Sequence, residues 1–246
     1  MTNVDRDFFA ANGYLSLGQI LAGEQLQRAV QLFDHDRSAN AWNWKRNAHH
    51  QTINCDALVT SPAFDSLIRH PTVLPAVAAL MGGPICFSEI CVRHMASFDG
   101  EPYQGWHRDR PRWDDHPLAM DYIQLMLYLS DVDEATHCFS ISPEQADGEQ
   151  RDQQEQLTEG GIVDLHGPAG TAILFNIAVL HTATVRVTQQ ERKSVQVYYG
   201  HRHRPVLSND STIPATLWRD DSEAETRAFY GNLNEKTRRY LAAFCP

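Results

Sequence analysis

The sequence predicts a mostly β protein with flanking helices, built on a double-stranded β-helix, or jelly-roll, core. From residue 85 to about residue 204, short runs of β-forming residues alternate with turn residues. The loops between these runs are long enough to cross from one sheet to another, which fits two packed sheets better than alternating β-α units. The segments on either side carry apolar residues at helical spacing instead.

The N-terminal third, residues 1–84, is expected to brace this core, mainly with helices. Residues 14–17 alternate like a short strand directly after Asn12-Gly13. Apolar residues at helical spacing predict a helix over 23–33. Two shorter helices are expected at 62–69 and 71–81, and Gly82-Gly83 ends the second of them.

Eight strands are expected in the core, near 85–88, 91–97, 122–129, 138–141, 161–164, 171–175, 181–187 and 194–200. The polar stretch 144–159 is interpreted as a solvated insertion, with a mobile lid as the alternative. Helices are expected again after Pro214, at about 222–232 and 233–244. We therefore expect one domain over 1–246, with a bracing segment at 1–84, a jelly-roll core at 85–204 and C-terminal helices at 215–246.

Composition excludes several functional classes. A formal net charge of -10 argues against a nucleic-acid or anionic-membrane partner. No apolar run approaches the roughly 18–20 residues that a membrane span needs, and the first residues do not form a secretion signal. Five cysteines without CxxC spacing argue against a disulfide framework. The expectation is a cytoplasmic protein that acts on a small molecule.

Three residues form a candidate metal site. His107 and Asp109 are two positions apart, so on an extended segment both side chains point to the same face. His181 begins a later β-rich run. Two imidazoles and one carboxylate on one face of an ion, with the opposite positions open, are typical of iron(II) oxygenases. With 12 histidines and 31 acidic residues, a single HxD pair is weak evidence by itself.

Arg192 makes this site more specific. It follows His181 by eleven residues, on the next expected strand, from which it can point into the same cavity. A guanidinium group there can bind a carboxylate through two hydrogen bonds. A hydrolytic or isomerase-type zinc site also uses such ligands but has no need of this clamp. A ligand-binding jelly roll without metal is the third alternative, disfavoured because all four residues are present together.

Several stretches resemble the phytanoyl-CoA dioxygenase family, a cupin-like branch of the Fe(II)/2-oxoglutarate-dependent oxygenases. They are the HxD motif, the strand GTAILFN at 170–176, Arg192, the opening FFAANGYLSL at 8–17, and the segments at 129–133 and 138–143. The resemblance spans all but about the last thirty residues. The sequence departs from the family at Pro143-Glu144-Gln145 and at Ala183, where many members carry a serine near the cosubstrate.

The resemblance implies that His107, Asp109 and His181 bind Fe(II) and form the catalytic centre. It implies 2-oxoglutarate and O2 as cosubstrates, with Arg192 holding the far carboxylate and the oxoacid decarboxylated to succinate. Gln124 and Thr182 are added as expected cofactor contacts. Family members that halogenate lack the carboxylate of Asp109, so its presence favours hydroxylation of a small metabolite or biosynthetic intermediate.

Further residues near the motif are candidates for the substrate side of the cavity. The candidates are Arg93, Arg110, Arg112, Trp113 and Tyr198. For the three that follow the motif, a solvated loop is the alternative. The sequence leaves open the substrate, the oligomeric state and the choice among hydroxylation, desaturation, demethylation and ring formation.

Overall fold

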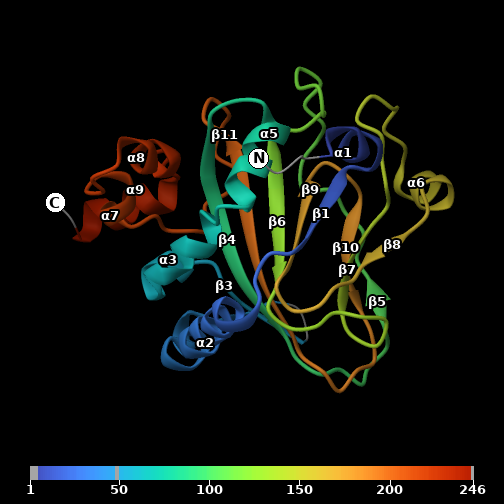
Figure 1. Ribbon diagram of the computed structural model, residues 1–246, viewed down its shortest axis with the longest axis horizontal. Helices are drawn as coiled ribbons and strands as arrows, with labels where there is room; N and C mark the ends of the chain where they lie inside the picture. Colours follow the sequence, from blue (N-terminus) through green and yellow to red (C-terminus); the bar gives the residue numbers. More distant parts are fainter. Residues whose placement is uncertain (1–4, 48–49, 245–246) are drawn as a thin grey trace.

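Two antiparallel sheets form the centre of the molecule (Figure 1). The computed structural model describes residues 5–47 and 50–244. The larger sheet has the strand order β1 (Tyr14–Gln19), β9 (Thr171–Asn176), β6 (Tyr122–Tyr128), β11 (Arg192–His201), β4 (Ile85–Met95), β3 (Gln51–Asn54) and β2 (Lys45–Asn47). The smaller sheet has the order β5 (Tyr103–Gln104), β10 (His181–Val185), β7 (Cys138–Ile141) and β8 (Val163–Leu165). The mostly β class is confirmed.

Helices flank these sheets. They are α1 (Arg6–Asn12), α2 (Gly23–Ala39), α3 (Ala57–Thr60), α4 (Asp65–Ile68), α5 (Val73–Met81), α6 (Gln153–Glu159), α7 (Ala215–Trp218), α8 (Ala224–Tyr230) and α9 (Glu235–Phe244), with 3-10 turns at Ala41–Asn43 and Pro62–Phe64. Apolar side chains of α2–α5 and α8 form one core with the large sheet. Among the described residues, no helix combines the length and the apolar character that crossing a bilayer requires.

The two faces of the large sheet serve different cores. Along β6, Ile123, Leu125 and Leu127 pack among the helices, whereas Tyr122, Met126 and Tyr128 pack toward the small sheet. This alternation follows from the two-residue period of a strand. The second core lies between the sheets and includes side chains from β7 and β9. The inner face of the large sheet is therefore the one on which a jelly-roll cavity is built.

The core strands agree closely with the sequence-based expectation, with one merger. The runs expected at 85–88 and 91–97 are a single strand, β4, which ends at Met95. It pairs with β11 along nearly its whole length, and the irregularity between Tyr198 and Tyr199 absorbs the change of register. Strand β11 begins at Arg192, two residues before the expected start.

The interpretation of residues 1–84 as only a brace was incomplete. Strand β1 pairs with β9, and β3 pairs with β4, so three strands of the large sheet come from this segment. The pattern missed β2 and β3 because they are short and polar, with sequences KRN and QTIN. Such segments become strands only when a neighbouring strand supplies hydrogen bonds.

The expectation of a solvated insertion at 144–159 is wrong in part. Asp152 caps α6 by accepting a hydrogen bond from the Glu155 backbone N–H. Glu144 and Gln156 are buried, and the Gln156 amide donates to the Ser142 hydroxyl and to the Pro143 carbonyl. The insertion is thus bound to the end of β7 by buried polar contacts.

Candidate metal centre

The backbone brings the HxD motif and the second histidine together. His107 and His181 exchange two backbone hydrogen bonds with N···O distances of 3.0 Å each. The Asp109 N–H donates to the Ile177 carbonyl, also at 3.0 Å. The motif is an isolated bridge beside β10 and not part of a longer strand. The extended pairing still points both side chains of the motif the same way.

The three side chains converge on one point. The Nε2 atom of His107 lies 3.4 Å from Oδ1 of Asp109, and Nε2 of His181 lies 3.7 Å from the same oxygen. One donor atom from each residue lies within 4.8 Å of the others. Donors about 2 Å from a shared ion lie about 3 Å apart. The spacing therefore suits one small divalent cation after slight contraction.

Hydrogen bonds orient both imidazoles. Nδ1 of His107 donates to the Gly105 carbonyl and Nδ1 of His181 donates to the Val179 carbonyl, each at 2.8 Å. A carbonyl can only accept, so each Nδ1 carries a proton, and each Nε2 can bind a metal ion once it is deprotonated. The hydrogen bond to Asp109 raises the pKa of His107. Burial opposes ionisation of Asp109, but hydrogen bonds from both histidines hold its carboxyl pKa well below the usual range.

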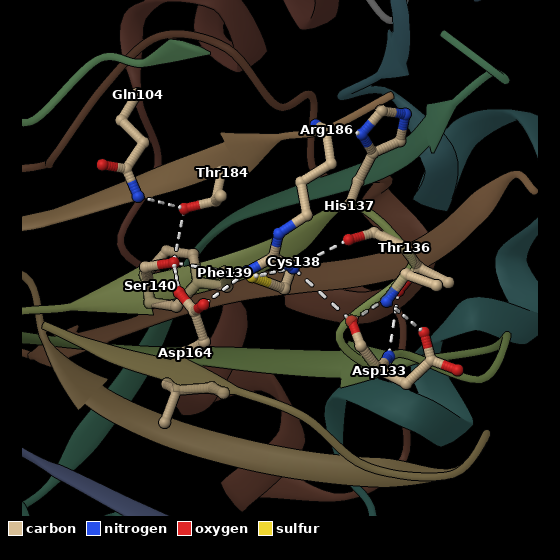
Figure 2. A network of polar contacts seen from close by, with 12 residues as sticks. Gln104, Asp133, Thr136, His137, Cys138, Phe139, Ser140, Asp164, Thr184 and Arg186 are labelled. Atoms are coloured by element: carbon tan, nitrogen blue, oxygen red, sulfur yellow. Dashed lines mark hydrogen bonds and ion pairs between the residues drawn. The ribbon is translucent and has the colours of Figure 1, made fainter. Parts of the chain in front are cut away.

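A polar network on the outer face of the small sheet supports the loop before His107 (Figure 2). The Gln104 amide donates to the Thr184 hydroxyl at 2.8 Å, and Thr184 is bonded in turn to Ser140. The Ser140 hydroxyl donates to Asp164, which Arg186 also binds. Gln104 directly precedes Gly105, whose carbonyl orients His107. The network therefore fixes the position of one ligand through the backbone.

Thr182 belongs to this supporting layer. It neighbours His181 on β10, so its side chain points to the opposite face of the strand. Its hydroxyl accepts a hydrogen bond from the Gly105 N–H at 2.9 Å. The expected cofactor contact at Thr182 does not fit this orientation, because an alternating strand cannot direct two adjacent side chains into one cavity.

Glu144 links the two segments that carry the ligands, and the sequence did not suggest this role. One of its oxygens, Oε1, accepts from Nη2 of Arg108 at 2.7 Å and from the Leu180 N–H at 2.8 Å. Arg108 lies between His107 and Asp109, while Leu180 precedes His181. The departure from the family pattern at 143–145 thus places a buried acid behind the metal centre.

Three neighbouring side chains on the inner face of the large sheet have polar atoms without partners. Arg192 is only 1 % exposed, yet none of its three guanidinium nitrogens has a hydrogen-bond partner among the described residues. The Ser194 hydroxyl and Nε of Arg93 are also buried and unpaired. Arg93 lies opposite Ser194 in the β4–β11 register and donates through Nη1 to Oε1 of Gln51 at 2.7 Å. Buried donors are nearly always satisfied, so this cluster is suited to an anionic ligand.

A row of four inward-facing residues crosses the large sheet at the level of the metal centre. Phe175, Gln124, Tyr198 and Glu89 face one another in register on β9, β6, β11 and β4. The Phe175 ring lies 5.0 Å from the ring of His181, between centroids. The Tyr198 hydroxyl donates to Oδ2 of Asp109 at 3.1 Å. The Gln124 amide has no hydrogen-bond partner within the described chain and is 2 % exposed, so it remains a candidate cofactor contact.

The three candidates after the motif are engaged in other contacts. Arg110 binds Asp121 at 2.7 Å. Arg112 donates to backbone carbonyls of the 145–148 segment and so fastens it to the loop. Trp113 stacks on His116 with 5.8 Å between ring centroids. Arg112 and Trp113 are half-buried beside exposed Asp114 and Asp115, as the alternative of a surface loop expects, and a substrate-facing role for them stays a prediction.

A second group of metal-ligand types lies on the outer network. Cys138, Asp164 and His166 offer ligand atoms within 4.8 Å of one another. However, Arg186 donates to the Cys138 sulfur at 3.2 Å and also binds the Asp164 carboxylate (Figure 2). A guanidinium group already supplies the positive charge that a metal would bring. This group is a structural ion pair.

A family model and one hydroxylase of known name match most of this chain's length in sequence. The family model for phytanoyl-CoA dioxygenase (PhyH) matches residues 9–194. L-Proline trans-4-hydroxylase of Streptomyces griseoviridis is 24% identical over 186 residues, which cover 59% of this chain and 69% of that protein.

Two solved structures are similar in fold. EctD from S. alaskensis with bound Fe has a TM-score of 0.68 at 17% identity, and the match covers 92% of this chain and 86% of the EctD chain. The epimerase SnoN in complex with Fe3+, alpha ketoglutarate and nogalamycin RO has a TM-score of 0.64 at 17% identity. The match covers 80% of this chain and 82% of the SnoN chain. The predicted jelly-roll core is confirmed. The matched segment contains His107, Asp109, His181 and Arg192, and the chain therefore belongs to the phytanoyl-CoA dioxygenase family of Fe(II)- and 2-oxoglutarate-dependent oxygenases.

Proposed function

We propose that this oxygenase hydroxylates a small molecule, with His107, Asp109 and His181 binding iron and Arg192 binding the far carboxylate of 2-oxoglutarate. The observation that carries the cosubstrate assignment is the fully buried, unpaired guanidinium group of Arg192 on the same inner face as Tyr198. A buried charge without a partner is costly, and a dicarboxylate would remove that cost. A zinc hydrolase would leave this group unexplained.

The residues of the chain prepare the site for this chemistry. When bound, iron and 2-oxoglutarate supply the oxidising power, and the oxoacid is converted to succinate. His107, Asp109 and His181 approach from one side, which leaves the opposite side for cosubstrate and oxygen. Tyr198 holds Oδ2 of Asp109, so Oδ1 stays turned toward the histidines. Phe139 and Phe175 pack against His181 and exclude water from that side.

The substrate is proposed to be a small metabolite or biosynthetic intermediate. The hydroxylase from S. griseoviridis is named for L-proline and SnoN is complexed with nogalamycin RO, both small molecules. Asp109 favours hydroxylation over halogenation. The cytoplasmic location and the single-domain organisation remain predictions.

The direct test is anaerobic addition of Fe(II) and then 2-oxoglutarate to the purified protein. We expect a weak visible charge-transfer band that needs both components, followed by succinate formation when oxygen is admitted. Zn(II) in place of Fe(II) is the matched control and should give neither signal. A protein that binds Fe(II) but shows no band at millimolar 2-oxoglutarate would contradict the cosubstrate assignment.

Ser194→Ala is expected to weaken 2-oxoglutarate binding about tenfold, because one hydrogen bond to a charged group contributes about 1.5–3 kcal/mol. The unpaired Ser194 hydroxyl lies two residues after Arg192 on the same strand face. Anaerobic titration of the visible band measures the dissociation constant. Ala183→Ser in the Ser194→Ala background restores the hydroxyl at the family's usual position and should recover part of the affinity. Unchanged affinity in Ser194→Ala would remove Ser194 from the cosubstrate site.

A further inference from the structure

Glu89 is a buried side chain on the inner face of β4, the face that Tyr198 shares on β11. It is 9 % exposed and lies directly opposite Tyr198 in the β4–β11 register. Side chains at opposed positions of antiparallel strands are about 5 Å apart at Cβ. Tyr198 is hydrogen-bonded to Asp109 at 3.1 Å. One side chain therefore separates Glu89 from a proposed metal ligand.

The surroundings of Glu89 lack a cation. Oε2 accepts a hydrogen bond from the Ser208 hydroxyl, and Oε1 has no hydrogen-bond partner among the described residues. Within the same residues, no lysine, arginine or histidine forms an ion pair with this carboxylate. Burial, together with the negative charges of Asp210 and Asp109, raises the pKa of Glu89 to about 8. A cation bound beside Glu89 would lower this pKa and stabilise the ionised carboxylate.

An acidic and a basic side chain lie at separate positions on the inner face of β4. Arg93 follows Glu89 by four residues on the same face, which corresponds to about 13 Å along a strand. In the β4–β11 register Arg93 lies opposite Ser194, and Met95 lies opposite Arg192. The cationic part of this sheet face thus coincides with the proposed site of the dicarboxylate cosubstrate. Glu89 lies apart from that site, opposite Tyr198.

We infer that Glu89 and Ser208 form the recognition site for an amine on the substrate, so that the protein oxidises small cationic amines. The inference rests on the proposed function and names the substrate class of the same cavity. An ammonium group would satisfy the free oxygen of Glu89 and compensate its buried charge. Binding there places the carbon atoms next to the nitrogen beside Tyr198 and the metal centre. Oxidation consumes one O2 and one 2-oxoglutarate, inserts one oxygen atom into a C–H bond and releases succinate and CO2.

The test compares amines with their neutral N-acetyl counterparts. The probes are L-proline, pyrrolidine and n-butylamine, each paired with its N-acetyl derivative. Two readouts are measured: the shift of the anaerobic Fe(II)–2-oxoglutarate band on adding the probe, and probe-stimulated succinate release in air. We expect at least one free amine to give both signals and its N-acetyl counterpart to give neither. In Glu89→Gln, the amine concentration for half-maximal band shift should rise about 30-fold or more.

Glu89→Gln preserves the shape and the hydrogen bond from Ser208 and removes only the ionisable group, so the variant should melt close to the wild-type temperature. Glu134→Gln, at an exposed acid, is the matched control and should behave as wild type. An intact band with no response to any amine would overturn the inference, as would equal responses to both members of a pair or undiminished amine affinity in Glu89→Gln. Absence of the band itself contradicts the proposed function instead, which keeps the two failures distinguishable.

Discussion

Asp109→Ala is expected to lower Fe(II)-dependent conversion of 2-oxoglutarate to below about one hundredth of the wild-type rate. Changes in residues that only orient metal ligands cost about 10–100-fold in affinity or activity, and Asp109 is proposed as a ligand itself. The substitution removes the one anionic donor and frees the Tyr198 hydroxyl that binds it. Succinate formation measures turnover, and anaerobic Fe(II) titration measures metal affinity.

Asp114→Ala is the matched control for Asp109→Ala. Asp114 is exposed in the same loop, so the change in net charge is identical without a change in the metal centre. This control should retain wild-type turnover and iron affinity. Full activity in Asp109→Ala would refute the ligand assignment, because two histidines alone do not complete the three-donor face.

Arg192→Ala is expected to raise the 2-oxoglutarate concentration needed for half-maximal turnover about 100-fold or more, with Fe(II) affinity unchanged. A bidentate guanidinium–carboxylate pair contains two charge-assisted hydrogen bonds of about 1.5–3 kcal/mol each. Burial lowers the pKa of Arg192, because the guanidinium charge is removed from water. The variant should therefore lose little folding stability, as thermal unfolding without ligand will show.

Two further variants separate charge from geometry at this position. Arg192→Lys keeps the positive charge but not the planar pair of donors. Its 2-oxoglutarate concentration for half-maximal turnover should therefore lie between those of the wild type and Arg192→Ala. Arg28→Ala removes an exposed arginine on α2 and serves as the control for net charge. An unchanged 2-oxoglutarate requirement in Arg192→Ala would exclude this residue from the cosubstrate site.

Local sequence pattern predicted the core strands but not their full extent. The strand at Cys138–Ile141 matches its expected bounds, since alternating or continuous β-forming residues mark buried strands directly. Strands β2 and β3 could not be predicted in this way, because their polar residues become strands only by pairing with each other and, through β3, with β4. The insertion at 144–159 was predicted from its polarity alone, although burial of Glu144 depends on Arg108 and Leu180.

The sequence by itself determined the metal-ligand types at His107, Asp109 and His181 and the arginine after them, because spacing on extended segments directs side chains to known faces. Only the tertiary structure decided which neighbours share the cavity. It turned Thr182 outward, linked Glu144 to both ligand segments, and brought Ser194 and Glu89 onto the inner face. The physical reason is that burial and cross-strand register depend on residues far apart in the chain. They decide whether a buried polar group has a hydrogen-bond partner within the protein or is free to bind a ligand.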